Sequence, residues 1–116
     1  MNRFALAAIL ISLPAAAQAT GGFTCRTGGA RTIEAIVGFG HVAGSPLILT
    51  RLIDNRRTVA VRSAQWWLDD RELRLILTDP DGQRREVIVK ARRNGRTYDG
   101  DLWRGGKRHW VRCRES

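Results

Sequence analysis

The stretch that decides the fold is the C-terminal third of the chain, 83-QRREVIVKARRNGRTYDGDLWRGGKRHWVRC-113. It predicts three β-strands joined by two tight turns, at Asn94-Gly95 and at Gly105-Gly106. Both dipeptides tolerate the positive φ angles that two-residue hairpins need. Pairing outward from either turn places Tyr98, Gly100 and Leu102 on one mostly apolar face. Because a one-residue slip would turn every side chain over, this agreement predicts one inner and one outer face.

Each turn also predicts a register. A third turn, Asp79-Pro80-Asp81-Gly82, adds the preceding strand, because proline presets φ and glycine supplies the left-handed residue. The predicted pairs are Leu75 with Val87 and Leu73 with Val89; then Ala91 with Tyr98, Val89 with Gly100 and Val87 with Leu102; then Leu102 with His109, Gly100 with Val111 and Tyr98 with Cys113. All three registers share one inner face.

The rest of the chain carries short alternating segments, with a turn about every 8–12 residues and no sustained helical period. Further strands are expected over residues 20–26, 31–38, 46–53, 57–68 and 71–78, with a glycine-rich loop over 38–46. The register of 57–68 stays open. Either Val59, Val61, Ser63, Gln65 and Trp67 share one face, or a bulge turns Ala64 and Trp66 inward.

The first 19 residues resemble a Sec-type secretory signal peptide. Arg3 precedes an apolar run over 4–13, and small residues at Ala17 and Ala19 predict cleavage before Thr20. A run of about ten apolar residues is too short for a membrane span, which needs about 20. No lipoprotein signal precedes Cys25. The sequence therefore predicts a single domain over 20–116, not transmembrane, in the periplasm or outside the cell.

Cys25 and Cys113 lie near opposite ends of that domain. In an oxidising compartment we expect them to form a disulfide, with two buried free thiols as the alternative. The first and last strands would then be neighbours, so the sheet would close on itself. We therefore predict an all-β fold, a small antiparallel β-barrel of about eight short strands closed by one disulfide. An OB-type barrel is the alternative, since closing a sheet removes its edges in both cases.

The formal net charge of +9 comes almost entirely from arginine. Such a surface attracts anions, and in a cell envelope these are lipopolysaccharide phosphates, anionic phospholipid headgroups and acidic polymers. Nucleic acid is electrostatically as suitable, but an exported protein is not expected to meet it. The plain alternative is a solvated basic surface that binds nothing in particular. The oligomeric state stays open.

Tryptophans and cations gather around the Gly105-Gly106 turn. Exposed indoles beside arginines are typical of recognition surfaces, although an intramolecular Trp–Arg stack is the simpler explanation, since single surface hydrophobic residues are common. We expect Arg104 and Trp110 to point away from the inner face. The candidate binding residues near this turn are Trp103, Arg104, Lys107, Arg108, Trp110 and Arg112.

Signals of catalysis are poor. His41 and His109 show no metal-ligand spacing, and neither Ser45 nor Ser63 lies in an activating motif. The glycine-rich segment 38–44 lacks the spacing of a dinucleotide-binding loop. We therefore expect no enzyme, no metal and no cofactor.

Four short motifs, Phe23-x-Cys25, Asn94-Gly95-x-x-Tyr98, Leu102-Trp103-x-x-Gly106 and Val111-x-Cys113, resemble the bacterial periplasmic inhibitors of c-type lysozyme. Those proteins are small disulfide-linked antiparallel β-barrels whose Ser-Gly-x-x-Tyr and Trp-x-Lys-Gly motifs insert into the lysozyme cleft. Here Asn94 stands at the serine position and Arg104 at the lysine position. The resemblance implies an exported, non-enzymatic binding protein with a lysozyme-like protein partner. The alternative is a basic module for anionic envelope glycans or lipids.

Overall fold

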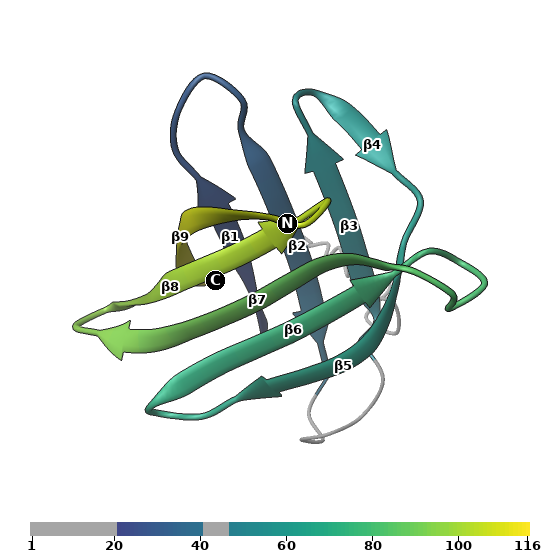
Figure 1. The fold of residues 1–116 in the computed structure, drawn as a ribbon. Helices are drawn as coiled ribbons and strands as arrows, with labels where there is room; N and C mark the ends of the chain where they lie inside the picture. Colours follow the sequence, from purple (N-terminus) through teal and green to yellow (C-terminus); the bar gives the residue numbers. More distant parts are fainter. Residues whose placement is uncertain (1–20, 41–46) are drawn as a thin grey trace, which may run out of the picture.

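The computed structural model describes residues 21–40 and 47–116, which form one antiparallel β-sheet (Figure 1). The predicted signal peptide and most of the predicted loop 38–46 lie outside these ranges. The strands are β1 (Gly21–Thr27), β2 (Ile33–Phe39), β3 (Leu49–Asp54), β4 (Arg57–Val59), β5 (Arg62–Leu68), β6 (Glu72–Thr78), β7 (Arg85–Asn94), β8 (Thr97–Arg104) and β9 (Lys107–Glu115). Among the described residues, no helix has the length and apolar character needed to cross a membrane.

The sheet has the order β4-β3-β2-β1-β9-β8-β7-β6-β5 and curls so that its two halves face each other (Figure 1). Every pair is antiparallel, so β4 and β5 run in the same direction. Only Ala60 and Val61 separate them, and together they form one bent strand that pairs first with β3 and then with β6. The all-β prediction is confirmed, with the predicted strand 57–68 divided at this bend.

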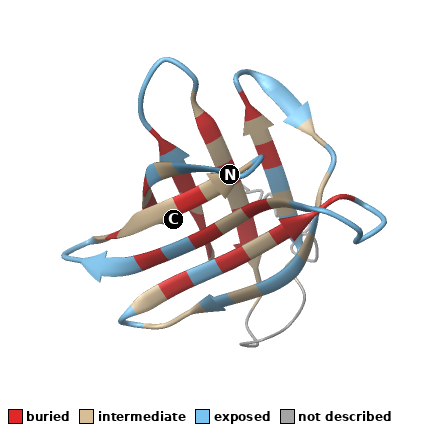
Figure 2. Ribbon diagram, viewed as in Figure 1, coloured by how far each residue is buried: buried red, intermediate tan, exposed pale blue. Residues whose placement is uncertain are grey.

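The curled sheet encloses one apolar core, visible in Figure 2 as buried positions that recur along most of the strands, including β6, β7 and β8. Gly100 lies on the inner face of β8, where an added Cβ would overlap the carbonyl oxygen of Lys90. Glycine therefore lets β7 and β8 approach closely there. The core residues are Phe23, Cys25, Ile33, Ala35, Val37, Leu52, Leu73, Leu75, Leu77, Val87, Val89, Ala91, Tyr98, Leu102, Val111 and Cys113.

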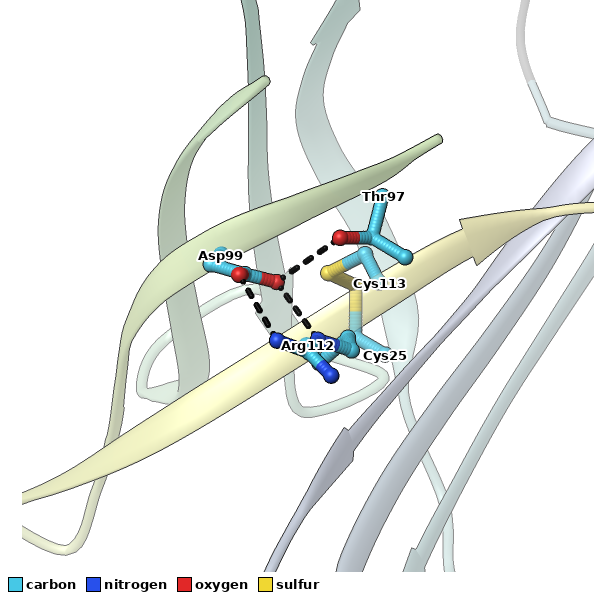
Figure 3. The surroundings of a disulfide bond; sticks show 5 residues. All are labelled: Cys25, Thr97, Asp99, Arg112 and Cys113. Carbon is cyan, nitrogen blue, oxygen red and sulfur yellow. Dashed lines mark hydrogen bonds and ion pairs between the residues drawn. A yellow bond between two sulfur atoms is a disulfide. The ribbon is translucent and has the colours of Figure 1, made fainter. Parts of the chain in front are cut away.

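The predicted disulfide is present. Cys25 and Cys113 are fully buried, are bonded to each other and pair directly across β1 and β9. The bond spans 88 positions of sequence and joins the two halves of the sheet where the terminal strands meet (Figure 3). No cysteine is left free in the described chain.

The register predicted from Gly105-Gly106 is confirmed, with Leu102 opposite His109 and Tyr98 opposite Cys113. Both glycines have positive φ, 58° and 76°, as the two-residue turn requires.

The register predicted from Asn94-Gly95 is wrong by two residues. Asn94 stays in the strand and pairs with Thr97, so Val89 lies opposite Leu102. The reason is that Gly95 alone takes a positive φ, 67°, which is the requirement of a turn with glycine at its first central position.

The register predicted across Asp79-Pro80-Asp81-Gly82 is wrong by the same two residues, because Leu75 pairs with Val89. The loop is longer than a tight turn. The Asp79 carboxylate accepts hydrogen bonds from the backbone amides of Gln83 (2.8 Å) and Arg84 (2.6 Å) and so holds both residues in the loop. Since both shifts are even, the inner face is unchanged.

The open register of 57–68 is decided by a bulge in β5. Ser63 pairs with Leu77 and Gln65 with Ile76, so Ala64 is the extra residue. After the bulge Trp66 lies opposite the buried Leu75 and packs against the core, while Ala64 itself is exposed. The second alternative is therefore confirmed for the bulge and for the inward Trp66, but it is wrong for Ala64.

Candidate functional site

The outer face of β5–β9 brings together two rows of side chains. The first row, in strand order, is Trp67, Arg74, Lys90, Asp101 and Trp110. The second row, one step along the strands, is Gln65, Ile76, Ile88, Trp103 and Arg108. Each residue is directly opposite the next one in its row. Aromatic, cationic and aliphatic groups therefore meet on this face although they are far apart in sequence.

Trp103 and Trp110 are diagonal neighbours on β8 and β9, as the predicted outer face requires. Trp110 is 55% exposed. The guanidinium carbon of Arg112 lies 5.1 Å from the centre of the Trp110 ring, close enough for a cation–π contact. The intramolecular Trp–Arg stack considered from the sequence is therefore present.

Arg112 is held in place by Asp99 beside the disulfide (Figure 3). Its Nε and Nη2 donate to the two carboxylate oxygens of Asp99 at 2.9 and 3.0 Å. Asp99 also accepts hydrogen bonds from Asn94 and Thr97. These contacts, with Arg112 first, hold the pKa of Asp99 well below its usual range. Arg112 thus supports Trp110 from one side as a fixed cation.

A shallow hollow of about 310 Å³ lies beside the Gly105-Gly106 turn. Its lining comes from β7, β8 and the turn: Arg85, Ile88, Lys90, Trp103, Gly105 and Gly106. A second hollow of about 240 Å³ continues across β7, β6 and β5, sharing Ile88 and Lys90 with the first and adding Ile76 and Gln65. The two hollows are therefore neighbours across four strands, and we call them together the outer groove.

The cations Lys90, Arg85 and Arg108 around the outer groove form only weak intramolecular interactions. Lys90 places Nζ 5.9 Å from the centre of the Trp103 ring, and within the described ranges neither Lys90 nor Arg85 forms a salt bridge. Arg108, at the end of the second row, is 69% exposed with its Nε 4.0 Å from Asp101. Exposed pairs of this kind contribute little to stability, so these charges stay available to a ligand.

Arg104 does not belong to this surface, and the prediction that it points away from the inner face is wrong. It lies on the same side of β8 as Leu102, and its side chain is only 19% exposed. Its Nε donates to Asp54 at 2.8 Å and its Nη1 donates to Glu86 at 2.9 Å. At this end of the barrel the carboxylates of Asp54 and Glu86 bind the side chain of Arg104 and hold it on the inner side of the sheet.

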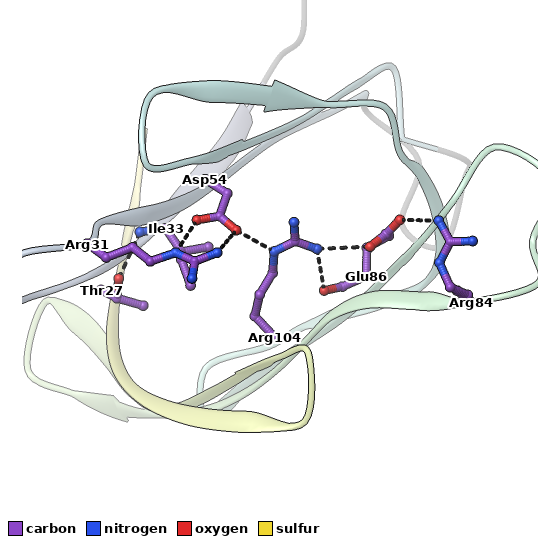
Figure 4. A network of polar contacts seen from close by, with 7 residues as sticks. All are labelled: Thr27, Arg31, Ile33, Asp54, Arg84, Glu86 and Arg104. Atoms are coloured by element: carbon purple, nitrogen blue, oxygen red, sulfur yellow. Dashed lines mark hydrogen bonds and ion pairs between the residues drawn. The ribbon is translucent and has the colours of Figure 1, made fainter.

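Arg104 is the centre of an alternating chain of charges, drawn in Figure 4 and called the end network: Arg31, Asp54, Arg104, Glu86 and Arg84. Asp54 ends β3 and Arg104 ends β8, so their bond ties together the two halves of the curled sheet. Glu86 reaches Arg104 because it is the extra residue of a bulge, where Thr78 and Leu77 pair with Arg85 and Val87.

Hydrogen bonds from Arg31 and then from Arg104 lower the pKa of the Asp54 carboxyl to about 2, against the opposing effect of burial. Arg31 contacts this carboxylate through two nitrogens, at 2.8 and 2.7 Å. Asp54 is 5% exposed, so it depends on both partners for its charge. The end network is therefore a structural element of the barrel.

The two remaining predicted binding residues, Lys107 and Asn94, lie in different parts of the sheet. Lys107 is exposed at the start of β9, beside the turn. Asn94 ends β7 opposite Thr97, which begins β8 and lies seven residues from Arg104 along that strand, or roughly 24 Å. Its amide donates to Asp99 at 2.8 Å. The structure therefore gathers Trp103, Arg108, Trp110 and Arg112 on one face and links Asn94 to Arg112 only through Asp99.

Sequence reasoning did not assign Arg74, Ile88 and Lys90 to the site. Only the strand order brings β6 and β7 beside β8 on the same face, and the registers from two of the turns were shifted. The available signal was alternation along the strands, which puts Arg74 between the inner residues Leu73 and Leu75, and Lys90 between Val89 and Ala91; both Arg74 and Lys90 are exposed.

Searches for related proteins found no matching family model, no matching curated protein and no matching solved structure. The resemblance to lysozyme inhibitors stays a prediction. Among the described residues, no three His, Cys, Asp or Glu side chains lie together as metal ligands.

Proposed function

We propose that the protein is a small exported, non-enzymatic binding protein that holds anionic glycans or lipids of the cell envelope on the outer face of β5–β9. The observation that carries the proposal is the meeting of Trp103, Trp110, Lys90 and Arg108 beside the outer groove. Indoles supply flat contact area, and cations that lack strong intramolecular partners supply attraction for anions.

Export is supported by the disulfide between Cys25 and Cys113, because such bonds persist in oxidising compartments. The net charge of +9 favours anionic partners of any kind. In an envelope these are phosphate- and carboxylate-bearing polymers and lipids.

Lysozyme inhibition is the second candidate. A disulfide-linked curled antiparallel sheet agrees with the architecture that the resemblance implies. The two implied contact residues give it less support, since Arg104 is engaged by Asp54 and Glu86, and Asn94 is engaged by Asp99.

The test is a set of binding isotherms for lipopolysaccharide, polygalacturonate and a c-type lysozyme at low and moderate salt. We expect an anionic ligand to bind at low salt and to weaken steeply as the screening length falls from about 30 Å at 0.01 M to about 8 Å at 0.15 M. Inhibition of lysozyme, with no binding of either anionic ligand, would instead establish the second candidate.

A matched pair of variants locates the surface. Arg74→Ala removes an exposed outer-face arginine of β6, and Arg51→Ala removes an exposed outer-face arginine of β3, in the other half of the sheet. Each substitution lowers the net charge by one. The proposal requires Arg74→Ala to weaken binding more than Arg51→Ala does; equal losses would mean that only the overall charge matters.

A further inference from the structure

The floor of the outer groove is apolar. Ile76, Ile88 and Trp103 are consecutive members of the second row, and each is half-buried with part of its surface open to solvent. Gln65 closes the row on β5. With neighbouring strands roughly 4.8 Å apart, the floor from β8 to β5 is roughly 14 Å long. A compact anion would leave most of this floor uncovered.

The cations lie on the rims and at one end of the groove. Lys90 and Arg74 flank the floor on the side of the first row, and Arg85 lies beside the Gly105-Gly106 end. The two glycines themselves carry no side chain that could cover that end. The groove thus offers an apolar strip with positive charge at its border.

We infer that this groove binds the acyl chain of an anionic lipid, with the chain along Ile76, Ile88 and Trp103 and the head group at Lys90 and Arg85. The inference rests on the proposed function and names its ligand class. An acyl chain gains free energy by covering aliphatic surface, roughly in proportion to the area removed from water. A phosphate or carboxylate head group complements Lys90 and Arg85, which among the described residues meet no carboxylate within salt-bridge distance.

An acidic glycan fits the groove less well. Sugar rings are recognised by open aromatic faces, and the ammonium group of Lys90 already lies over the Trp103 ring at 5.9 Å. The aliphatic floor offers sugar hydroxyls no partner before Gln65 at its far end. Polygalacturonate therefore serves as the contrasting ligand in the test.

The test is calorimetric titration of the oxidised protein with octanoate, dodecanoate and dodecyltrimethylammonium, each below its critical micelle concentration. We expect the affinity to rise roughly tenfold from octanoate to dodecanoate, since four methylenes become partly buried. The cationic amphiphile should bind far more weakly than dodecanoate. Equal affinities for the two carboxylates, or equal binding of the cationic amphiphile, would overturn the inference.

Two matched pairs of variants identify the groove. Ile88→Thr should lower dodecanoate affinity roughly fivefold and octanoate affinity less, whereas Ile36→Thr, on the outer face of β2, should change neither. Lys90→Ala should lower the affinity for both carboxylates roughly fivefold, whereas Lys107→Ala, outside the groove lining, should change it little. If the members of either pair behave alike, the groove is not the site.

The two proposals fail in different ways. Binding of polygalacturonate or lipopolysaccharide without binding of dodecanoate would overturn the lipid inference and leave the proposed function standing. If no anionic ligand binds at low salt, both are overturned.

Discussion

Arg104 and Arg108 lie four residues apart on one hairpin and behave as opposites. Arg104 points into the end of the barrel, is 19% exposed and binds Asp54 and Glu86. Arg108 points outward, is 69% exposed and approaches Asp101 only at 4.0 Å. The end network and the outer face therefore use the same residue type for different purposes. Its surroundings, and not its charge, decide whether an arginine holds the fold together or stays available to a ligand.

The largest effect should come from removing the disulfide, which joins the two halves of the sheet on which both regions lie. Replacing Cys25 and Cys113 by serine opens an 88-residue connection, which should cost roughly 4–5 kcal/mol of unfolding free energy in the chain-entropy model. Denaturant unfolding of the double variant measures this, and binding should be lost together with the fold. A loss below about 1 kcal/mol would show that the two halves of the sheet hold together without the bond.

Arg104→Ala should be the most destabilising arginine substitution of the hairpin. It leaves Asp54 and Glu86 without a shared partner, and we expect a loss of about 2–3 kcal/mol, somewhat below the cost for a fully buried pair. Thermal unfolding of Arg104→Ala beside Arg104→Lys measures the effect. Since lysine cannot bond both carboxylates with a planar fork, Arg104→Lys should recover only part of the loss.

Acid should weaken the end network at Asp54 and, at lower pH, the pair of Asp99 with Arg112 on the outer face. The pKa of Asp54 is lowered to about 2 in the folded protein, so its contribution is present above the unfolded value near 4 and is lost as the pH falls through 2. This corresponds to about 2 kcal/mol. Unfolding free energies measured from pH 5 to pH 2 should show this slope, and Asp54→Asn should reduce it while the contribution of Asp99 remains. An unchanged slope in Asp54→Asn would place the acid sensitivity elsewhere, for example at Asp99.

The smallest effect should come from Arg108→Ala. Its exposed pair with Asp101 contributes little, so the unfolding free energy should change by less than about 0.5 kcal/mol. The same melting experiment as for Arg104→Ala gives the comparison. A loss as large as that of Arg104→Ala would abolish the distinction between the two regions.

The sequence predicted the inner face well, because alternation is a property of each strand by itself. Tyr98, Leu102 and the two cysteines are buried as expected, and the Gly105-Gly106 register is correct. The other two registers failed by two residues because the local turn conformation decides them. Gly95 takes the first central position of its turn, and the Asp79 carboxylate lengthens the next loop.

The site was predicted less completely than the fold, and Arg104 explains why. Alternation from Leu102 favours the inner side for Arg104, but we predicted that it points outward because an inward arginine needs partners that the sequence does not reveal. One partner, Asp54, is 50 residues away, and the other, Glu86, is re-aimed by a bulge. The outer groove was missed for a similar reason, since Ile76, Ile88 and Trp103 become neighbours only through the registers of three strands.

The most direct test of the division between the two regions measures Trp110→Ala and Arg104→Ala in parallel. Each variant receives a melting curve and a lipopolysaccharide isotherm at low salt, well below its melting temperature. We predict that Trp110→Ala weakens binding by roughly 1–2 kcal/mol and leaves the melting temperature nearly unchanged, as an exposed interface anchor would. Arg104→Ala should lower the melting temperature and leave binding within about threefold of the original, since its contacts are internal. If Trp110→Ala lowers the melting temperature sharply while binding is unchanged, the hairpin is scaffold and the proposed binding surface is wrong.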